Sequence, residues 1–287
     1  MGVAPVRPRA FSARGDTLSK GRLLEIMELT TVGEPKRIVV TGAAPEGARD
    51  PESAARAIRE MFASIAPRYD LLNHVLSFNI DHLWWRRTAR TFAHILAKPN
   101  AHVLDLCCGT GDLTLALWGE SKKKSPEDGA HAILGADFAH PMLRRAVHKS
   151  QRKPLRWVEA DALTLPVSDS RFDLVTSAFG FRNLADYDAG LREIFRVLRP
   201  GGECGILDFG EPGGLMGKLY RVYFKRVLPR VGALISGVQG PYSYLPASVE
   251  RFPSPAEMLG RMKRAGFTEV SWTPYTFGIA GLFRGKK

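Results

Sequence analysis

The sequence predicts an α/β fold built on a doubly wound, mostly parallel sheet, with an antiparallel hairpin at its C-terminal edge. Between residues 102 and 209, short apolar runs of strand length alternate with longer segments whose apolar residues recur at helical spacing. Short turns that contain glycine or acidic residues follow these runs. Such an alternation produces parallel strands joined by helices, and open sheets of this kind bind ligands at the carboxyl ends of their strands.

The composition is that of a chain that can bury its own core. The 287 residues are 45% hydrophobic and 24% charged, and no stretch reaches the ~20 consecutive apolar residues of a membrane-spanning helix. The formal net charge of +12 favours anionic partners, such as acidic lipid surfaces, nucleic acids or small anions. The three cysteines form no C-x-x-C pair and the seven histidines are scattered, so neither a metal site nor a redox dithiol is predicted.

Two regions differ in composition. Residues 1–50 are rich in alanine, glycine, proline and charge, with little periodic apolar pattern, so we predict a disordered leader. Its basic character leaves an organelle-targeting peptide open, and Met27 leaves a second start position open. Residues 51–287 are predicted to form one domain. Its first part, residues 51–98, has apolar side chains at helical spacing, which predicts helices with a break at Pro67.

The sheet is predicted from five apolar runs and from the C-terminal tail. The runs have strand length and cover residues 102–106, 131–137, 155–161, 172–179 and 203–209. Helices are expected between them, beginning at Asp112 or covering residues 141–150 and 187–198. Two further β-like runs around Pro274 predict the hairpin at the sheet edge.

A glycine turn follows the first predicted strand, in "VLDLCCGTGDLT". Gly109 and Gly111 lack a Cβ atom, so the backbone there can approach a ligand closely. The dinucleotide fingerprint has a third glycine three residues later, where this chain has Thr114, and the Gly-Lys-Ser/Thr of a phosphate loop is absent. The glycine turn alone therefore leaves the ligand open.

Acidic residues at successive strand ends narrow the choice of ligand. Asp137 is placed to accept both ribose hydroxyls of an adenosine, Asp161 to accept from its exocyclic amine, and Asp105 adds a carboxylate near the glycine turn. Several acids around one ligand disfavour pyrophosphate and favour a cation. S-adenosylmethionine carries a sulfonium and an ammonium, so these residues predict it as the cofactor. The alternative for each single aspartate is a helix cap or a turn.

Four segments together resemble the class I methyltransferases: "VLDLCCGTGD", "GADFAHPML", "ADALTLPVSDSRFDLVTSAFGFRN" and "LREIFRVLRPGG". The narrower segments "IAPRYDLLN", "FGFRN" and "YLPASVERFP" are similar to the UbiE/MenG-type C-methyltransferases of ubiquinone and menaquinone synthesis. The resemblance runs from about Met61 to Gly285 and implies a Rossmann-like fold. It also implies C-methylation of a polyprenyl quinol, with demethylmenaquinol converted to menaquinol. The alternative acceptor is 2-methoxy-6-polyprenyl-1,4-benzoquinol in ubiquinone synthesis, alone or as well.

The resemblance implies contacts to S-adenosylmethionine by Thr110, Asp137 and the Asp161-Ala162 pair. Ala178 occupies the position where some members have a serine that touches the cofactor, and Ser177 precedes it. The complete set of cofactor-binding residues that we predict comprises Asp105, Gly109, Thr110, Gly111, Asp137, Asp161, Ala162 and Ala178.

Arg182 and Asn183 of "FGFRN" are the predicted catalytic residues, since they follow the fourth strand and are expected to face the methyl-transfer crevice. Arg182 would stabilise a quinolate or position a water that takes the proton. The alternative is a structural arginine bound to a carbonyl or a carboxylate. The weaker candidates for lining the acceptor site are Tyr69, Asp70, Asn73, Tyr242 and Tyr244.

Residues 217–230, "GKLYRVYFKRVLPR", are the predicted membrane contact. On a helix, Lys218, Arg221 and Lys225 share one face, and aromatic and aliphatic side chains lie toward another. Such a helix can lie in the interface of an anionic bilayer, although most amphipathic helices pack on their own domain. We therefore expect a cytoplasmic protein that is peripheral at the inner face of the membrane. A homodimer is left open.

The net charge also raises a different class of function, an RNA methyltransferase. The basic residues outside 217–230 are dispersed, and we find no appended RNA-binding module in the sequence. Binding to nucleic acid is therefore not predicted, and this class is kept as a minor alternative.

Overall fold

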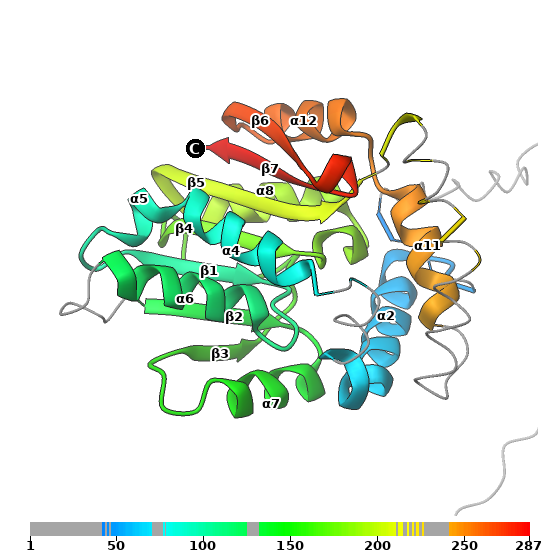
Figure 1. Ribbon diagram of the computed structural model, residues 1–287, viewed down its shortest axis with the longest axis horizontal. Coiled ribbons are helices and arrows are strands. Elements are labelled where there is room, and N and C mark those ends of the chain that lie inside the picture. Colours follow the sequence, from blue (N-terminus) through cyan, green and yellow to red (C-terminus); the bar gives the residue numbers. More distant parts are fainter. Residues whose placement is uncertain are drawn as a thin grey trace, which may run out of the picture. The chain divides into compact units, whose positions relative to one another are not determined.

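In the part of the chain that the structure describes, seven strands form one sheet in the order β3-β2-β1-β4-β5-β7-β6 (Figure 1). The first five of these strands pair in parallel, and β7 is antiparallel to both β5 and β6. This arrangement confirms the predicted doubly wound sheet with an antiparallel edge hairpin. The strands are β1 (His102–Leu106), β2 (Ala132–Asp137), β3 (Arg156–Glu159), β4 (Phe172–Ala178), β5 (Leu198–Phe209), β6 (Thr268–Tyr275) and β7 (Ala280–Lys286).

The computed structural model describes residues 42–43, 45, 47–70, 77, 79–124, 132–210, 212–214, 217, 220, 222–223, 226 and 241–287. These residues belong to one unit, Val40–Lys287. Most of the predicted leader, together with Asn73 and most of segment 217–230, lies outside the described residues. None of the helices within them is long and apolar enough to cross a membrane.

Helices cover both faces of the sheet (Figure 1). Side chains of α4 (Asp81–Thr91), α5 (Ala93–Leu96) and α6 (Asp112–Lys124) form one core with the sheet. Side chains of α8 (Tyr187–Val197) and α12 (Pro255–Arg264) form a second core with its other face. The remaining elements are α2 (Pro51–Ile65), η1 (Ala66–Arg68), α7 (His140–Lys149), η2 (Phe181–Asn183), α11 (Pro241–Arg251) and η4 (Thr276–Gly278).

The N-terminal helices follow local signals. Asp50 caps α2 in a reciprocal pair of hydrogen bonds with Ser53, and Pro51 occupies the first helical position, where its missing N–H costs nothing. The break predicted at Pro67 is confirmed, since α2 ends at Ile65 and passes into η1. The second predicted helix is divided into α4 and α5 at Phe92.

The C-terminal hairpin was predicted correctly in kind, but the position of its turn was wrong. Pro274 lies inside β6, opposite Gly281 of β7, and the chain reverses through η4 instead. The edge position of β6 explains why a proline is tolerated there, because one side of an edge strand needs no backbone donor.

Candidate active site

A cleft opens at the carboxyl ends of β1, β2 and β4, where the strand order of the sheet reverses between β1 and β4. It encloses about 1000 Å³, including space that is open to solvent. One side is built by strand ends and the turns that follow them. The other side carries apolar and aromatic residues from α2, α4 and the stretch around η2. Figure 1 shows α2 and α11 beside this end of the sheet.

The glycine turn requires glycine at two positions. Gly111 has a φ of 85°, and a Cβ there would lie 2.5 Å from the ring of Trp157. Gly109 has a φ of 55°, yet a Cβ there would meet nothing nearer than the Tyr69 ring at 3.9 Å. Backbone conformation thus demands glycine at both, and packing adds a second reason at Gly111. Both of these predicted residues belong to the turn, and Gly109 lines the cleft.

The predicted strand-end acids all line the cleft. Asp137 accepts hydrogen bonds from the backbone N–H of Gly109 at 2.8 Å and of Ala139 at 2.9 Å, so it fixes the glycine turn against β2. Burial raises the pKa of its carboxyl. Asp161 accepts from Leu163 N–H at 2.9 Å, and Ala162 follows it in the lining. Each carboxylate oxygen retains acceptor capacity for a ligand.

Asp105 is fully buried at the end of β1. Its oxygens accept hydrogen bonds from the hydroxyls of Thr114 at 2.6 Å and Thr176 at 2.9 Å. Burial raises the pKa of Asp105 to about 7 against the effect of these two donors. Its charge therefore changes near neutral pH, and a cation bound nearby would favour the ionised form.

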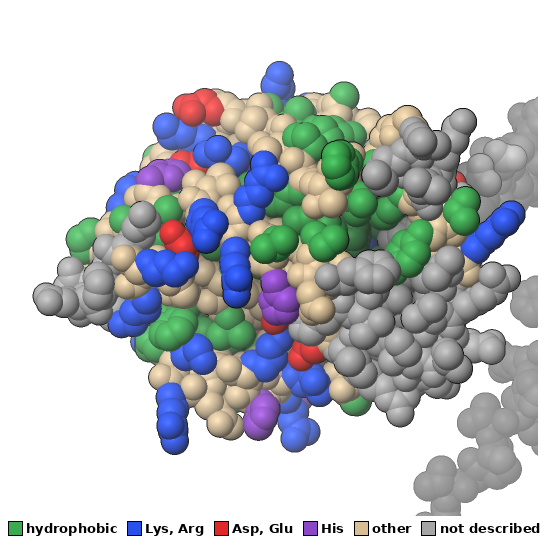
Figure 2. Space-filling view, in the orientation of Figure 1, with side chains coloured by type: hydrophobic (Ala, Val, Ile, Leu, Met, Phe, Trp, Pro, Cys, Tyr) green, Lys and Arg blue, Asp and Glu red, His purple; other side chains and the backbone are tan. Residues whose placement is uncertain are grey.

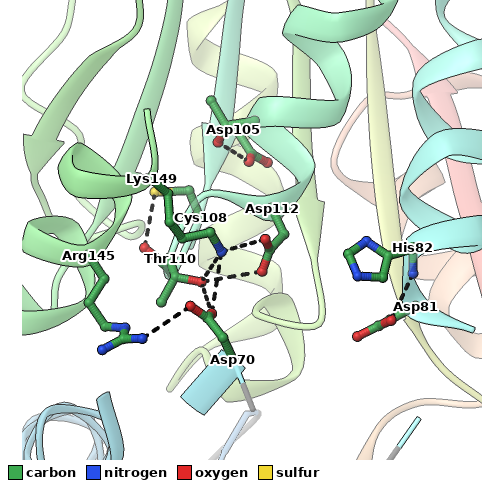
Figure 3. A network of polar contacts seen from close by, with 11 residues as sticks. Asp70, Asp81, His82, Asp105, Cys108, Thr110, Asp112, Arg145 and Lys149 are labelled. Atoms are coloured by element: carbon green, nitrogen blue, oxygen red, sulfur yellow. Dashed lines mark hydrogen bonds and ion pairs between the residues drawn. The ribbon is translucent and has the colours of Figure 1, made fainter. Parts of the chain in front are cut away.

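A polar network fastens the N-terminal segment to the glycine turn (Figure 3). Thr110 Oγ1 donates to Asp70 Oδ1 at 2.5 Å, and Arg145 lies 3.4 Å from the other oxygen of Asp70. Lys149 Nζ lies 2.5 Å from Asp112 Oδ1 and 3.4 Å from Asp70 Oδ1. Partial burial opposes ionisation of Asp70, yet the Thr110 hydroxyl, Lys149 and Arg145 hold its pKa below the usual value. Asp70, predicted for the acceptor site, thus contacts the glycine turn.

Arg182 makes the contacts that the structural alternative requires. Its guanidinium binds the carbonyl of Phe179 and lies 3.0 Å from Asp208 Oδ1, and its backbone N–H donates to Asp208 Oδ2. Its Nε donates to Ser248 Oγ at 3.4 Å. Arg182 and Asp208 are both buried, and neither lines the cleft. The guanidinium therefore orders the turn after β4 without itself lining the cleft.

Asn183 lines the cleft beside this turn. Its Oδ1 accepts from the Tyr244 hydroxyl at 3.1 Å, and its Nδ2 donates to the Phe179 carbonyl at 3.4 Å. Burial raises the pKa of Tyr244 to about 12, so its hydroxyl stays protonated as a donor. The Asn183 amide is thereby held in one orientation.

The other predicted residues are distributed as follows. Tyr69 and Ala178 line the cleft, and Tyr242 lies in α11 with its side chain outside the described residues. Cys107 and Cys108 line the cleft as free thiols, and burial raises the pKa of both well above the usual value. Among the described residues no cluster of ligands for a metal ion occurs.

Sequence reasoning missed the apolar side of the cleft and two polar residues. Asp112 and Lys149 carry the network described above. The missed apolar residues are Ala55, Phe62, Trp85, Leu113, Phe138, Met142, Ala160, Leu163, Phe179, Leu184 and Ala185. Helical spacing marks Phe62 and Trp85 as inward-facing, but it is the same for a core and for a cleft.

Comparisons with known proteins agree with this geometry. Residues 50–287 match the model of the ubiE/COQ5 methyltransferase family. The chain is 48% identical over 241 residues to a demethylmenaquinone methyltransferase of Deinococcus radiodurans, covering 83% of this chain and 95% of that protein. It is 51% identical over 230 residues to a demethylmenaquinone methyltransferase of Thermus thermophilus, covering 79% and 100%.

A third relative carries both quinone classes in its name. It is the ubiquinone/menaquinone biosynthesis C-methyltransferase UbiE of Geobacter sulfurreducens, 40% identical over 235 residues, with 80% of this chain and 88% of that protein covered. Among solved structures, a SAM-dependent methyltransferase of Thermotoga maritima superposes with a TM-score of 0.56 at 18% identity, covering 79% and 99%. At this identity the likeness concerns the fold alone.

Proposed function

Because the chain belongs to the ubiE/COQ5 methyltransferase family, we propose that it methylates a ring carbon of a polyprenyl quinol, with demethylmenaquinol as the acceptor. S-adenosylmethionine, the methyl donor of this fold, supplies an electrophilic methyl group on a sulfonium when bound. Two relatives at 48% and 51% identity that are named demethylmenaquinone methyltransferase support this acceptor. The name of the Geobacter sulfurreducens relative supports ubiquinone precursors as a second acceptor class.

The observation that carries the proposal is the charge of the cleft. Four aspartates line it, while no lysine, arginine or histidine of the described chain does; they are Asp105, Asp112, Asp137 and Asp161. Lys149 is paired with Asp112, but the lining itself is acidic, so it disfavours a ligand with phosphates and would stabilise a sulfonium and an ammonium. Asp137, Asp161 and the backbone at Gly109 and Thr110 would hold the donor.

The opposite side of the cleft suits a flat ring with an apolar tail. Phe62, Trp85 and Phe179 offer aromatic faces, and Leu184 extends the apolar surface. Asn183 is a polar group of the cleft lining whose amide is fixed by Tyr244 and the Phe179 carbonyl. It can hold a phenolic oxygen so that the ring carbon approaches the donor in one geometry.

Arg182 acts through this turn as a positioning residue. Its pair with Asp208 and its bond to the Phe179 carbonyl keep Phe179 and Asn183 in place, without contact to the acceptor. Methylation of the ring carbon would form a C–CH3 bond as the S–CH3 bond of the donor breaks. The phenolic proton, whose loss makes the ring carbon nucleophilic, would first pass to water. The hydrogen on the methylated carbon would then leave as a proton while the oxygen regains one, so that the hydroquinone is restored and one proton is released overall. The ordered turn leaves Asn183 where its amide could bind the phenolic oxygen.

The proposal is tested by methyl transfer from labelled S-adenosylmethionine in detergent micelles. A reduced demethylmenaquinone and a reduced methoxy-polyprenyl-benzoquinone are offered in parallel. Turnover on the first assigns the enzyme to menaquinol formation, and turnover on both makes it dual in function. Binding of the cofactor without turnover on either quinol would overturn the proposal.

Membrane contact through residues 217–230 is a second proposal, supported by the lipid tail of such acceptors. Within this segment Val222 and Arg226 are exposed, whereas Tyr220 and Tyr223 are partly buried and pack, like Phe209, against Val249. The two tyrosines therefore face the domain, and Val222 with Arg226 forms the outer side. We also propose a cytoplasmic protein at the inner face of the membrane, without nucleic acid as a partner.

A further inference from the structure

Most of the large exposed apolar side chains of the described residues lie on segments beside one aromatic cluster. Four large hydrophobic residues are exposed, namely Leu83 at 61%, Val147 at 52%, Val222 at 53% and Phe277 at 78%. Leu83 precedes Trp84, whose ring packs against Phe209 and Phe179 with centroids 6.4 Å and 5.7 Å apart. Three of the four residues lie on segments that adjoin this cluster, since Val222 lies between two tyrosines that pack with Phe209 around Val249.

Phe277 is held outward by an unusual turn. Thr276 and Phe277 have φ values of 45° and 58°, a region that costs free energy for residues other than glycine. The indole N–H of Trp84 donates to Thr276 Oγ1 at 2.8 Å, which fixes the turn to α4. The turn thus adopts a strained backbone conformation while it presents an aromatic ring to solvent, and no burial of that ring within the domain compensates for the strain.

The exposed face of α4 continues from Leu83 as a basic stripe. Leu83, Arg86, Arg87 and Arg90 are all exposed and follow the i, i+3, i+4, i+7 spacing of one helix face. With His82 they make up the exposed residues of α4, and none of them is acidic. The guanidinium carbon of Arg87 lies 4.1 Å above the ring of Tyr275, next to η4, so the stripe and the turn form one surface.

This surface adjoins the cleft. Phe179 and Trp85 line the cleft, and Phe179 contacts Trp84 and Phe209. The buried Trp84 therefore links the cleft wall at Phe179 to the segment of Leu83 and, through Thr276, to the turn that carries Phe277. Figure 2 shows hydrophobic side chains over the β6–β7 turn, with Lys and Arg side chains beside them over α4 and α5.

We propose that Leu83, Phe277 and the arginine stripe of α4 dock the enzyme on an anionic lipid bilayer. Phe277 and Leu83 enter the boundary between headgroups and acyl chains, and Arg86 and Arg90 lie on acidic headgroups. The centre of a protein–protein interface contains few charged residues, whereas here single exposed apolar side chains lie beside several arginines. This composition favours a lipid surface as the partner. The inference rests on the proposed function, because it brings the cleft to a bilayer that holds a tailed acceptor, and it adds a contact beyond residues 217–230.

The test is co-sedimentation of the full chain with vesicles, without any quinol. Vesicles of phosphatidylcholine mixed with phosphatidylglycerol are compared with vesicles of phosphatidylcholine alone. Phe277→Asn removes the ring while tolerating the left-handed backbone, and should lower partition into anionic vesicles about tenfold. R86E/R90E should remove the dependence on phosphatidylglycerol. Val147→Ser, on α7, is the matched control for an exposed apolar residue and should bind as the unmodified chain does.

Turnover of a short-tailed, water-soluble quinol without vesicles separates this inference from the proposed function. Variants that lose vesicle binding but keep this turnover support both. If the unmodified protein methylates no quinol but the variants still lose vesicle binding, the docking surface is supported and the proposed function is rejected. Unchanged vesicle binding of Phe277→Asn and R86E/R90E would overturn the docking surface. Self-association of the chain that Phe277→Asn abolishes, without vesicle binding, would overturn it as well.

Discussion

The hydroxyl of Thr110 donates to the carboxylate of Asp70 across 2.5 Å, and this bond joins two parts of the chain with separate tasks. Thr110 belongs to the glycine turn at the cofactor side of the cleft. Asp70 follows η1, close to Phe62 and Tyr69 on the acceptor side. The two halves of the cleft are therefore coupled through this contact.

Asp70→Ala should weaken binding of S-adenosylmethionine about tenfold, because a hydrogen bond to a charged group contributes ~1.5 kcal/mol or more and the turn loses its support. Titration calorimetry measures the effect. Glu60→Gln, an exposed change on α2, serves as the control and should bind the cofactor normally. An unchanged dissociation constant for Asp70→Ala would separate the N-terminal segment from the cofactor site.

Cofactor binding should depend on pH through Asp105, whose pKa is raised to about 7 by burial. A cationic cofactor prefers the ionised carboxylate, so affinity should fall as the pH drops below about 7 and level off above it. Binding below that pH should release a proton, which calorimetry in buffers of different ionisation enthalpy detects. Asp105→Asn should flatten the profile. S-adenosylhomocysteine, which lacks the sulfonium, should show a weaker dependence; an equal dependence would argue against charge as the cause.

The Arg182–Asp208 pair should act mainly on stability. Breaking a buried ion pair from one side leaves a buried charge without its partner, which costs ~3 kcal/mol. Asp208→Asn and Arg182→Met, which each remove one charge of the pair, should each lower the free energy of unfolding by about this amount, and the double variant should lose much less than the sum. Denaturant unfolding measures it. If Arg182→Lys lost turnover with full stability and unchanged KM, Arg182 would act on the acceptor directly.

Two glycines provide a matched pair. Gly111→Ala meets both a φ of 85° and the Trp157 ring, so it should destabilise the chain by ~2 kcal/mol and abolish strong cofactor binding. Gly119, within α6, has open space at its Cβ position. Gly119→Ala should therefore stabilise the chain by about 0.5–1 kcal/mol through helix propensity alone. Thermal unfolding with and without cofactor compares the two; equal effects would contradict the packing at Gly111.

Much of the fold followed from local pattern. The strand His102–Leu106 and the helix start at Asp112 were predicted to the residue, because an apolar run, a glycine turn and an amphipathic segment follow one another there. The strand-end acids were found because the carboxyl ends of parallel strands meet at one edge of a sheet. The hairpin turn was misplaced because Pro274 signals a turn in sequence but is also tolerated on an edge strand.

The parts of the site that were missed depend on contacts between distant segments. Asp70 pairs with Lys149 and Arg145, which lie more than seventy residues later, so nothing in "PRYDLLN" indicates its partner. Arg182 pairs with Asp208, which lies in β5, and nothing in "FGFRN" indicates that partner. Phe62 and Trp85 have the same spacing as core residues, and only the fold places them at a cleft.

The position of the transferred methyl group tests the central claim most directly. Reduced demethylmenaquinone is incubated with S-adenosylmethionine that carries a labelled methyl group, and the product is analysed by nuclear magnetic resonance. We expect the label on a ring carbon, since the cleft is built to hold a quinol ring beside a cationic donor. A label on a phenolic oxygen, or no labelled quinone while the cofactor is bound, would contradict it.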